Sequence, residues 1–173
     1  MQHESELQRA RAFESTGDLA SARAVYLAIL DADGDQLFVR MRLSALEQVT
    51  GHYRLSLEHT LKAADSVRKN RDWKQLSAVA RRLLSFDEYA AVHDLIMGAD
   101  WTDADVLANS AILSQQLWLT DHFPEALRLI DVATARVRPS HVLSYSRANA
   151  LRYCGRMDEA TAEYERCIEL APD

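Results

Sequence analysis

The chain has 173 residues, 48% hydrophobic and 27% charged, which is enough apolar material for one folded domain with a sizeable core. Its net charge of −6 gives no overall attraction to nucleic acid or to anionic lipid. No stretch is apolar for long enough to span a bilayer, and the start, MQHESELQRA, lacks the basic and apolar parts of a signal peptide. We therefore expect a cytoplasmic protein without nucleic-acid or membrane partners.

The composition predicts an all-α protein. Only 5 glycines and 3 prolines are present, while Ala, Leu, Arg and Glu are abundant, so little of the chain can form hairpins or linkers. The two cysteines, Cys154 and Cys167, suit a reducing compartment. We interpret them as packed free thiols, and a disulfide between them stays an open alternative.

The first 34 residues predict a helix, a turn and a second helix. The helices cover Glu4–Ser15 and Leu19 to about Asp31, and the turn is Gly17-Asp18. Asp18 is placed to cap the second helix by accepting hydrogen bonds from its first amides. Gly34 stands where the chain leaves that helix, in a position that often requires a left-handed backbone.

The same pattern returns 34 residues later. Gly51 is the second turn, with a helix predicted over Gln36–Val49 before it and another over Tyr53–Val67 after it. A further 34 residues along, the turn falls at Ser85-Phe86, between helices predicted over Asp72–Leu84 and Asp87–Met97. We expect this third turn to be slightly long, because the pattern residues of its first helix are displaced by one residue from the positions set by the 34-residue spacing of Gly17 and Gly51. The first-helix marks of this third pair are Trp73, Leu76, Ser77 and Ala80.

Capping residues and a proline indicate where helices begin in the last two pairs and in the connection that precedes them. Thr102 and Asp105 predict a capping box, and Pro124 suits the opening turn of a helix because its missing amide hydrogen costs nothing there. The fourth turn is Asp121-His122, which places two inserted residues at the joint before it. Ser140 is expected to cap the fifth pair. The predicted spacings of the five turns, 34, 34, 36 and 34, are too regular for chance.

The last stretch carries the strongest family marks: Gly155, Ala160, Tyr164, Cys167 and Pro172. At this spacing they resemble the second half of a tetratricopeptide repeat, a 34-residue helix-turn-helix unit. The resemblance implies an α-solenoid of about five such repeats wound as a right-handed superhelix, in which neighbouring pairs stack to bury a continuous core. The repeats run at about 3–36, 37–70, 71–104, 107–140 and 141–173.

Small and large residues then have separate packing roles. Small residues should let the two helices of a pair approach closely, and large ones should fill the space between pairs. The small set is Ala10, Ser44, Ser114 and Ala148, and the large set is Phe13, Tyr26, Leu43, Leu113, Leu117 and Tyr164.

The resemblance also implies where a ligand would bind. In that family the concave face is lined by the first helices of successive repeats, and this mixture of Arg, amide and aromatic side chains can hold a peptide. Two interpretations of Trp118, Tyr145 and Tyr153 stay open: groove anchors, or packing between repeats. The candidate peptide-binding residues are Arg11, Met41, Gln48, Gln75, Arg82, Gln115, Trp118, Tyr145, Asn149 and Arg152. The inward positions also include Leu7, Glu14, Ala45, Val79, Ala111 and Tyr153.

No chemistry of the chain's own is predicted. The chain contains no phosphate-binding loop, zinc-protease, serine-hydrolase or paired-cysteine motif, so we expect no cofactor, no metal and no catalysis. The acidic run Asp31–Asp35 resembles only the start of a calcium loop, because Gln36 and Arg42 stand where Gly and Glu are needed. His52 and His59 are interpreted as solvated side chains, since no third metal ligand is near.

Three functions fit this sequence. The first is a scaffold that binds a protein or peptide; of the chaperone-binding clamp of Lys and Asn only Asn149 is present. The second is a regulatory or targeting module of a larger enzyme, because the phrase GRMDEATAEYERCIELAPD resembles arrays in bacterial proteins that continue into a sulfotransferase or glycosyltransferase domain. The third is self-association, because no polar helix covers Tyr164, Ile168 and Leu170, which should leave apolar surface at this end.

Overall fold

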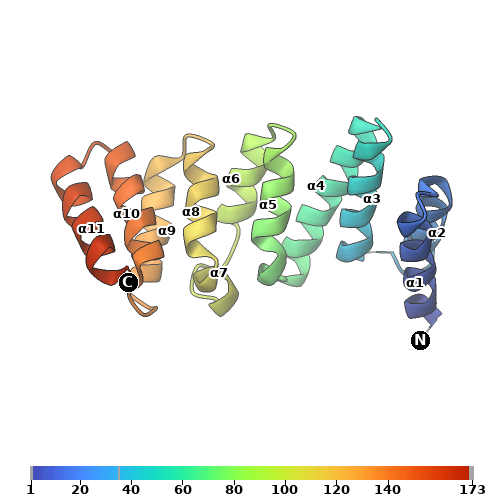
Figure 1. The fold of residues 1–173 in the computed structure, drawn as a ribbon, viewed down its shortest axis with the longest axis horizontal. Coiled ribbons are helices and arrows are strands. Elements are labelled where there is room, and N and C mark those ends of the chain that lie inside the picture. The colour runs from blue at the N-terminus through green and yellow to red at the C-terminus, as the bar shows by residue number, and fades with distance from the viewer. Residues whose placement is uncertain (1, 35, 172–173) are drawn as a thin grey trace. The chain divides into compact units, whose positions relative to one another are not determined.

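The computed structural model describes residues 2–34 and 36–171, and in this part of the chain every regular element is a helix. Contacts divide the chain into two compact units, residues 1–70 (unit 1) and 71–173 (unit 2). Both units consist of helices paired in sequence order (Figure 1). The all-α helical-repeat class predicted from the sequence is confirmed. Pro172, one of the family marks, and Asp35 of the acidic run lie outside the described residues.

Unit 1 contains two helix pairs. They are α1 (Gln2–Ser15) with α2 (Leu19–Asp33), and α3 (Leu37–Val49) with α4 (Tyr53–Asn70). Asp18 caps α2 as expected, since its side chain accepts a hydrogen bond from the amide of Ser21 at 3.0 Å. Gly34 ends the same helix at a φ of 70°. The core of the first pair and its neighbour is centred on Tyr26, which has no exposed surface.

Unit 2 contains three further pairs, and two of their first helices are interrupted. A 3-10 turn, η1 (Trp73–Gln75), leads into α5 (Leu76–Leu84), and the short α7 (Ala104–Ala108) leads into α8 (Ser110–Trp118). The second helices are α6 (Tyr89–Met97), α9 (Phe123–Thr134) and α11 (Met157–Leu170), and the last first helix is α10 (His141–Tyr153). Repeats three and four are tied together inside the core, where the Gln116 side-chain amide donates to the Ser77 carbonyl at 2.8 Å.

All five turns have the same backbone construction. One residue takes a φ between 59° and 82°, and the amide of the next residue donates to the carbonyl five positions back, at 2.7–3.2 Å. This bond satisfies a carbonyl that the helix end would otherwise leave without a partner. The residues with positive φ are Gly17, Gly51, Asp87, Asp121 and Gly155.

These turns correct the predicted phase of the third repeat. The positive φ falls on Asp87, not at Ser85-Phe86, so the spacings of the turn residues are 34, 36, 34 and 34. The two extra residues therefore lie between Gly51 and Asp87, and not at the joint before the fourth repeat. Seven positions before each turn stands a fully buried small residue: Ala10, Ser44, Ala80, Ser114 and Ala148. Ala80 occupies this position in the third repeat, where the sequence had suggested Ser77.

The packing roles expected for the other small and large residues are largely confirmed. Tyr26, Leu43, Leu113 and Leu117 are fully buried, whereas Phe13 and Tyr164 are only half-buried against the core. In the second repeat the close approach of the helices is polar, because the Ser44 hydroxyl lies 3.2 Å from that of Ser56 and 2.7 Å from that of Thr60.

The cap predicted at Ser140 and the place predicted for Pro124 are confirmed, and the cap predicted at Thr102 is wrong. Ser140 accepts from the amide of Leu143 at 3.3 Å, and Pro124 lies in the first turn of α9. Thr102 caps nothing, because its own amide and hydroxyl both donate to Asp100. Asp103 caps α7 in its place and accepts from the amide of Asp105 at 2.8 Å.

Both cysteines are half-buried free thiols. Cys154 lies just after the end of α10, and Cys167 of α11 lies beside the start of α10. The thiol of Cys167 donates to the carbonyl of His141, the first residue of α10, at 3.2 Å. The disulfide left open by the sequence is therefore not formed.

Candidate peptide-binding groove

A hollow of about 370 Å³ lies between the first helices α8 and α10 of unit 2. Six of the residues around it occupy inward positions predicted from the repeat spacing: Ala111, Gln115, Trp118, Tyr145, Asn149 and Arg152. Three more line the hollow that the spacing did not indicate: Ile112, Val142 and Ser146. Each of these three precedes a predicted residue by three positions, so a search along the same helix face would have found them. We call this hollow the α8/α10 groove.

A cluster of stacked aromatic rings adjoins the groove and reaches it through Trp118. The ring of Tyr153 stacks with those of Trp118 and Phe123, with centroid separations of 5.3 Å and 4.9 Å and interplanar angles of 21° and 7°. The guanidinium of Arg152 lies 4.5 Å from the centroid of Tyr153. Stacking of this kind fixes ring orientations and adds about 0.5–1.5 kcal/mol per pair beyond the buried area. Trp118 therefore packs between repeats and also lines the groove, so both interpretations offered for this residue apply.

Asn149 and Tyr145 are held by their neighbours in the fifth repeat. The Asn149 amide nitrogen donates to the Tyr145 carbonyl at 3.0 Å, and the Tyr164 hydroxyl donates to the Asn149 carbonyl oxygen at 2.9 Å. The side chain of Asn149 is thus buried and fixed in one orientation. The ring of Tyr145 meets that of Tyr164 edge-on, yet 56% of Tyr145 stays exposed beside the groove.

In the third repeat the predicted inward residues are out of register. Val79 is fully buried in the core, because the true turn is two positions further on. By the corrected spacing the inward positions are Ser77, Arg81 and Leu84. Gln75 is exposed on η1, and the guanidinium of Arg82 lies 5.3 Å from the centroid of Phe86. Neither Gln75 nor Arg82 lines the α8/α10 groove.

Two predicted inward residues of unit 1, Arg11 and Glu14, contact side chains of the other first helix, α3. The guanidinium of Arg11 lies 5.0 Å from the centroid of Phe38, and Arg42 forms an ion pair with Glu14. Met41 and Gln48 are half-buried. A hollow of about 230 Å³ beside the ion pair has Glu14 and Arg42 in its wall, so the charges there balance.

Another hollow of unit 2, of about 310 Å³, lies between the end of α9 and the start of α10. Its main cation is already neutralised, because Arg147 donates to Asp131 at 2.8 Å and to Glu163 at 2.7 Å. The α8/α10 groove differs in that its one cation, Arg152, forms no ion pair with any carboxylate of the described residues.

Buried charge in unit 1 supports the fold. Glu47 on α3 is fully buried, and its carboxylate accepts from Arg23 of α2 at 2.5 Å and lies 2.9 Å from the ring of His52. His59 of α4 is not the solvated side chain expected from the sequence, because its Nδ1 is buried and burial lowers the pKa of its imidazole. Among the residues described, no group of three or more His, Cys, Asp or Glu lies close enough to hold a metal ion.

Comparisons with known proteins agree with the repeat architecture. The sequence profile of the tetratricopeptide repeat matches residues 143–173, whereas no curated protein matches the chain in sequence. A crystal structure of MamA protein is 15% identical with a TM-score of 0.67, covering 96% of this chain and 90% of that one. TPR-like repeats of a kinesin light chain from Podosopora anserina are 16% identical with a TM-score of 0.64, covering 96% and 93%.

YrrB, described as a TPR protein with an unusual peptide-binding site, is 15% identical with a TM-score of 0.63, covering 97% of this chain and 86% of its own. At these identities the likeness concerns the fold. The chain has the helical-repeat fold of these proteins, and the sequence pattern of the tetratricopeptide repeat matches its last repeat. None of its described helices combines the length and the apolar character needed to cross a bilayer.

Proposed function

We propose that this protein is an interaction scaffold that holds a peptide segment of a partner protein in the α8/α10 groove and catalyses no reaction of its own. The observation that carries the proposal is the groove itself. Nine side chains from two successive first helices line one hollow, and all except Ser146 and Arg152 are apolar, aromatic or amide groups. Large amphipathic side chains with few rotatable bonds bind partners at low entropic cost, and a few polar groups fix orientation.

Blocking the groove tests this function. The whole chain would be immobilised and panned against displayed random 12-residue peptides, beside an Ala111→Trp variant that fills the hollow. An Ala162→Trp variant, which adds the same ring to an exposed position of α11 outside the groove, serves as the matched control. Wild type and Ala162→Trp should enrich the same peptides, and Ala111→Trp none of them. Equal enrichment by all three proteins would refute the groove.

Self-association is a second candidate, favoured by the exposed face of the last helix. On α11, Ile168 is 76% exposed and Leu170 is 36% exposed, as the sequence predicted for this end. Sedimentation equilibrium over a range of concentrations measures it directly. If α11 joins copies of the chain, Ile168→Glu should reduce the average mass to that of the monomer. A monomeric wild type would exclude this candidate.

A further inference from the structure

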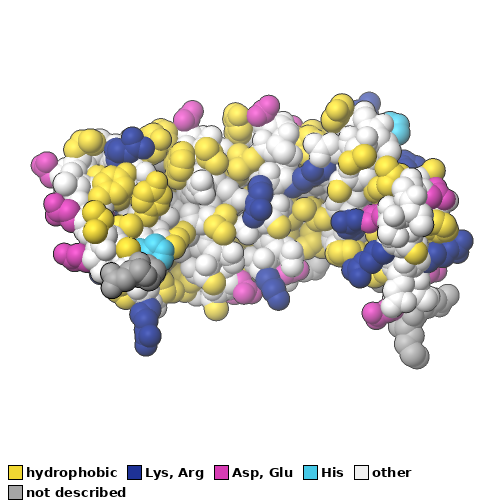
Figure 2. Space-filling view, in the orientation of Figure 1, with side chains coloured by type: hydrophobic (Ala, Val, Ile, Leu, Met, Phe, Trp, Pro, Cys, Tyr) yellow, Lys and Arg dark blue, Asp and Glu magenta, His cyan; other side chains and the backbone are white. Residues whose placement is uncertain are grey.

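Acidic side chains are distributed unevenly over unit 2. The chain has 26 acidic and 20 basic residues, yet the first helices α5, α8 and α10 contain no Asp or Glu at all. The carboxylates of unit 2 stand on the turns, on the joints and on the second helices, with Glu163 and Glu165 of α11 as examples. Over the first helices of this unit, Figure 2 shows hydrophobic and basic side chains, with the acidic ones along the margins.

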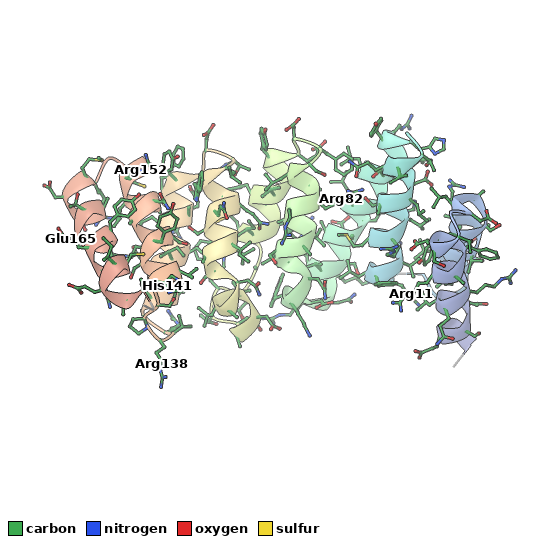
Figure 3. All side chains as sticks on the ribbon, in the orientation of Figure 1. Arg11, Arg82, Arg138, His141, Arg152 and Glu165 are labelled. Carbon is green, nitrogen blue, oxygen red and sulfur yellow. The ribbon has the colours of Figure 1, made fainter. Side chains whose placement is uncertain are left out.

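Arg152 is the cation of this acid-free surface. It is exposed near the turn end of α10, where Figure 3 labels it, and it lines the α8/α10 groove. The other arginines of the fifth repeat that form ion pairs do so with carboxylates outside the groove, as Arg147 does with Glu163 and Arg156 with Glu159. Arg152 instead contacts the ring of Tyr153 and hydrogen-bonds with the side chains of Tyr153 and Tyr164, which limits the positions of its guanidinium and leaves its charge without a carboxylate partner in the groove.

Exposed apolar side chains also line the groove. Val142 of α10 is 49% exposed and Ile112 of α8 is 42% exposed, and both line the groove. Water covers these side chains in the free protein, so an aliphatic or aromatic side chain of a ligand would bury apolar surface on both partners. The groove therefore offers an apolar floor at one end and a single positive charge at the other.

We propose that the segment held in this groove is an acidic, apolar peptide, with a carboxylate that meets Arg152 and a bulky aliphatic side chain that meets Ile112 and Val142. This inference rests on the proposed function and specifies the ligand class. A carboxylate accepting from a guanidinium is among the strongest hydrogen-bonded pairs in proteins, and no carboxylate of the groove competes for Arg152. A basic peptide would find no acid there and would meet Arg152 as a like charge.

Single-stranded nucleic acid is the competing anionic ligand, and the ring geometry disfavours it. Base stacking needs an open aromatic face, and the Tyr153 ring is already stacked with those of Trp118 and Phe123 and contacts the Arg152 guanidinium. The acidic margins of the unit would also repel a chain of phosphates.

Matched peptides test the ligand class. Fluorescein-labelled peptides taken from the display selection would be compared with versions in which each Glu or Asp is replaced by Gln or Asn, using anisotropy with the whole chain. We expect neutralisation to weaken binding to the wild type by about tenfold, and to change binding to Arg152→Gln by less than about twofold. Arg138→Gln, which removes an exposed arginine outside the groove, should behave as wild type. Arg152→Glu should prefer peptides in which Lys replaces the acidic residue.

The outcomes separate the two proposals. Peptides that bind, lose binding to Ala111→Trp and are indifferent to neutralisation would overturn the acidic ligand and leave the groove intact. Failure to select any peptide would overturn both. A labelled oligothymidine that binds more tightly than the acidic peptides, with the same loss in Ala111→Trp, would show that the groove takes nucleic acid, and the inference would be wrong.

Discussion

Single residues decide how each turn is closed. Three of the five turns have Gly at the position of positive φ, whereas the third and fourth have Asp87 and Asp121. Asp tolerates the left-handed region better than most residues but still pays a steric cost that Gly avoids. The predicted phase failed at one of these two turns. No glycine marks the third turn, so the 34-residue spacing placed it at Ser85, two residues too early.

Exchanging these turn residues should change stability in opposite directions. We expect Asp121→Gly to raise the free energy of unfolding by about 0.5 kcal/mol, because relief of strain slightly exceeds the added chain entropy. Gly155→Ala should lower it by about 1 kcal/mol, since nothing blocks the new methyl group and only the backbone conformation resists it. Urea titration measures both. Shifts of the same sign would contradict this account of the turns.

His59 should make unit 1 sensitive to mild acid. Burial is the main cause that lowers its pKa, and Arg40 and Lys62 act in the same direction, while Glu47 and Glu58 oppose them. Because its folded pKa lies below the unfolded value of about 6.5, the unfolded chain binds the proton more readily. The free energy of unfolding should therefore fall as pH drops through this value.

The measurement is urea unfolding by circular dichroism at pH 7.5 and 5.5. His59→Gln should lose part of the wild-type decrease, because the group that takes up the proton is gone. A decrease of equal size in the variant would show that other groups cause it.

At the scale of the helices, position in the repeat separates core from surface. Leu117 and Leu119 stand two residues apart at the end of α8, and the first is fully buried while the second is 50% exposed. Leu117→Ala should cost about 2–5 kcal/mol through lost burial and a residual cavity. Leu119→Ala should stay within about 0.5 kcal/mol of wild type. Thermal unfolding followed by fluorescence compares the two, and similar losses would mean that α8 packs differently.

Repeat spacing predicted the elements well and the site in part. Four of the five turns and nearly all helices follow from glycines, caps and period, because each is a local signal. The same spacing found six residues of the α8/α10 groove, since repeats four and five keep one phase. It could not show that Arg11 would meet Phe38 or that Arg42 would pair with Glu14 in unit 1. Those contacts depend on side-chain conformations that no periodicity fixes.

At the scale of the whole molecule, the two compact units should unfold separately. The three tryptophans, Trp73, Trp101 and Trp118, all lie in unit 2, whereas helix content comes from both units. We expect the urea midpoint from tryptophan fluorescence to differ from that of circular dichroism, and a fragment of residues 71–173 to keep the fluorescence midpoint of the full chain. Coincident transitions, together with an unfolded fragment, would show one cooperative unit.

The acid-free first helices of unit 2 also affect how the protein responds to dissolved salts. Chloride or phosphate from solution can gather at the exposed guanidinium of Arg152, and a partner must displace these ions. Screening lengths shrink from about 10 Å at 0.1 M to about 3 Å at 1 M ionic strength. Occupancy of the groove by the proposed acidic peptide should thus fall as ionic strength rises, so added salt alone should weaken binding without any rearrangement of the helices.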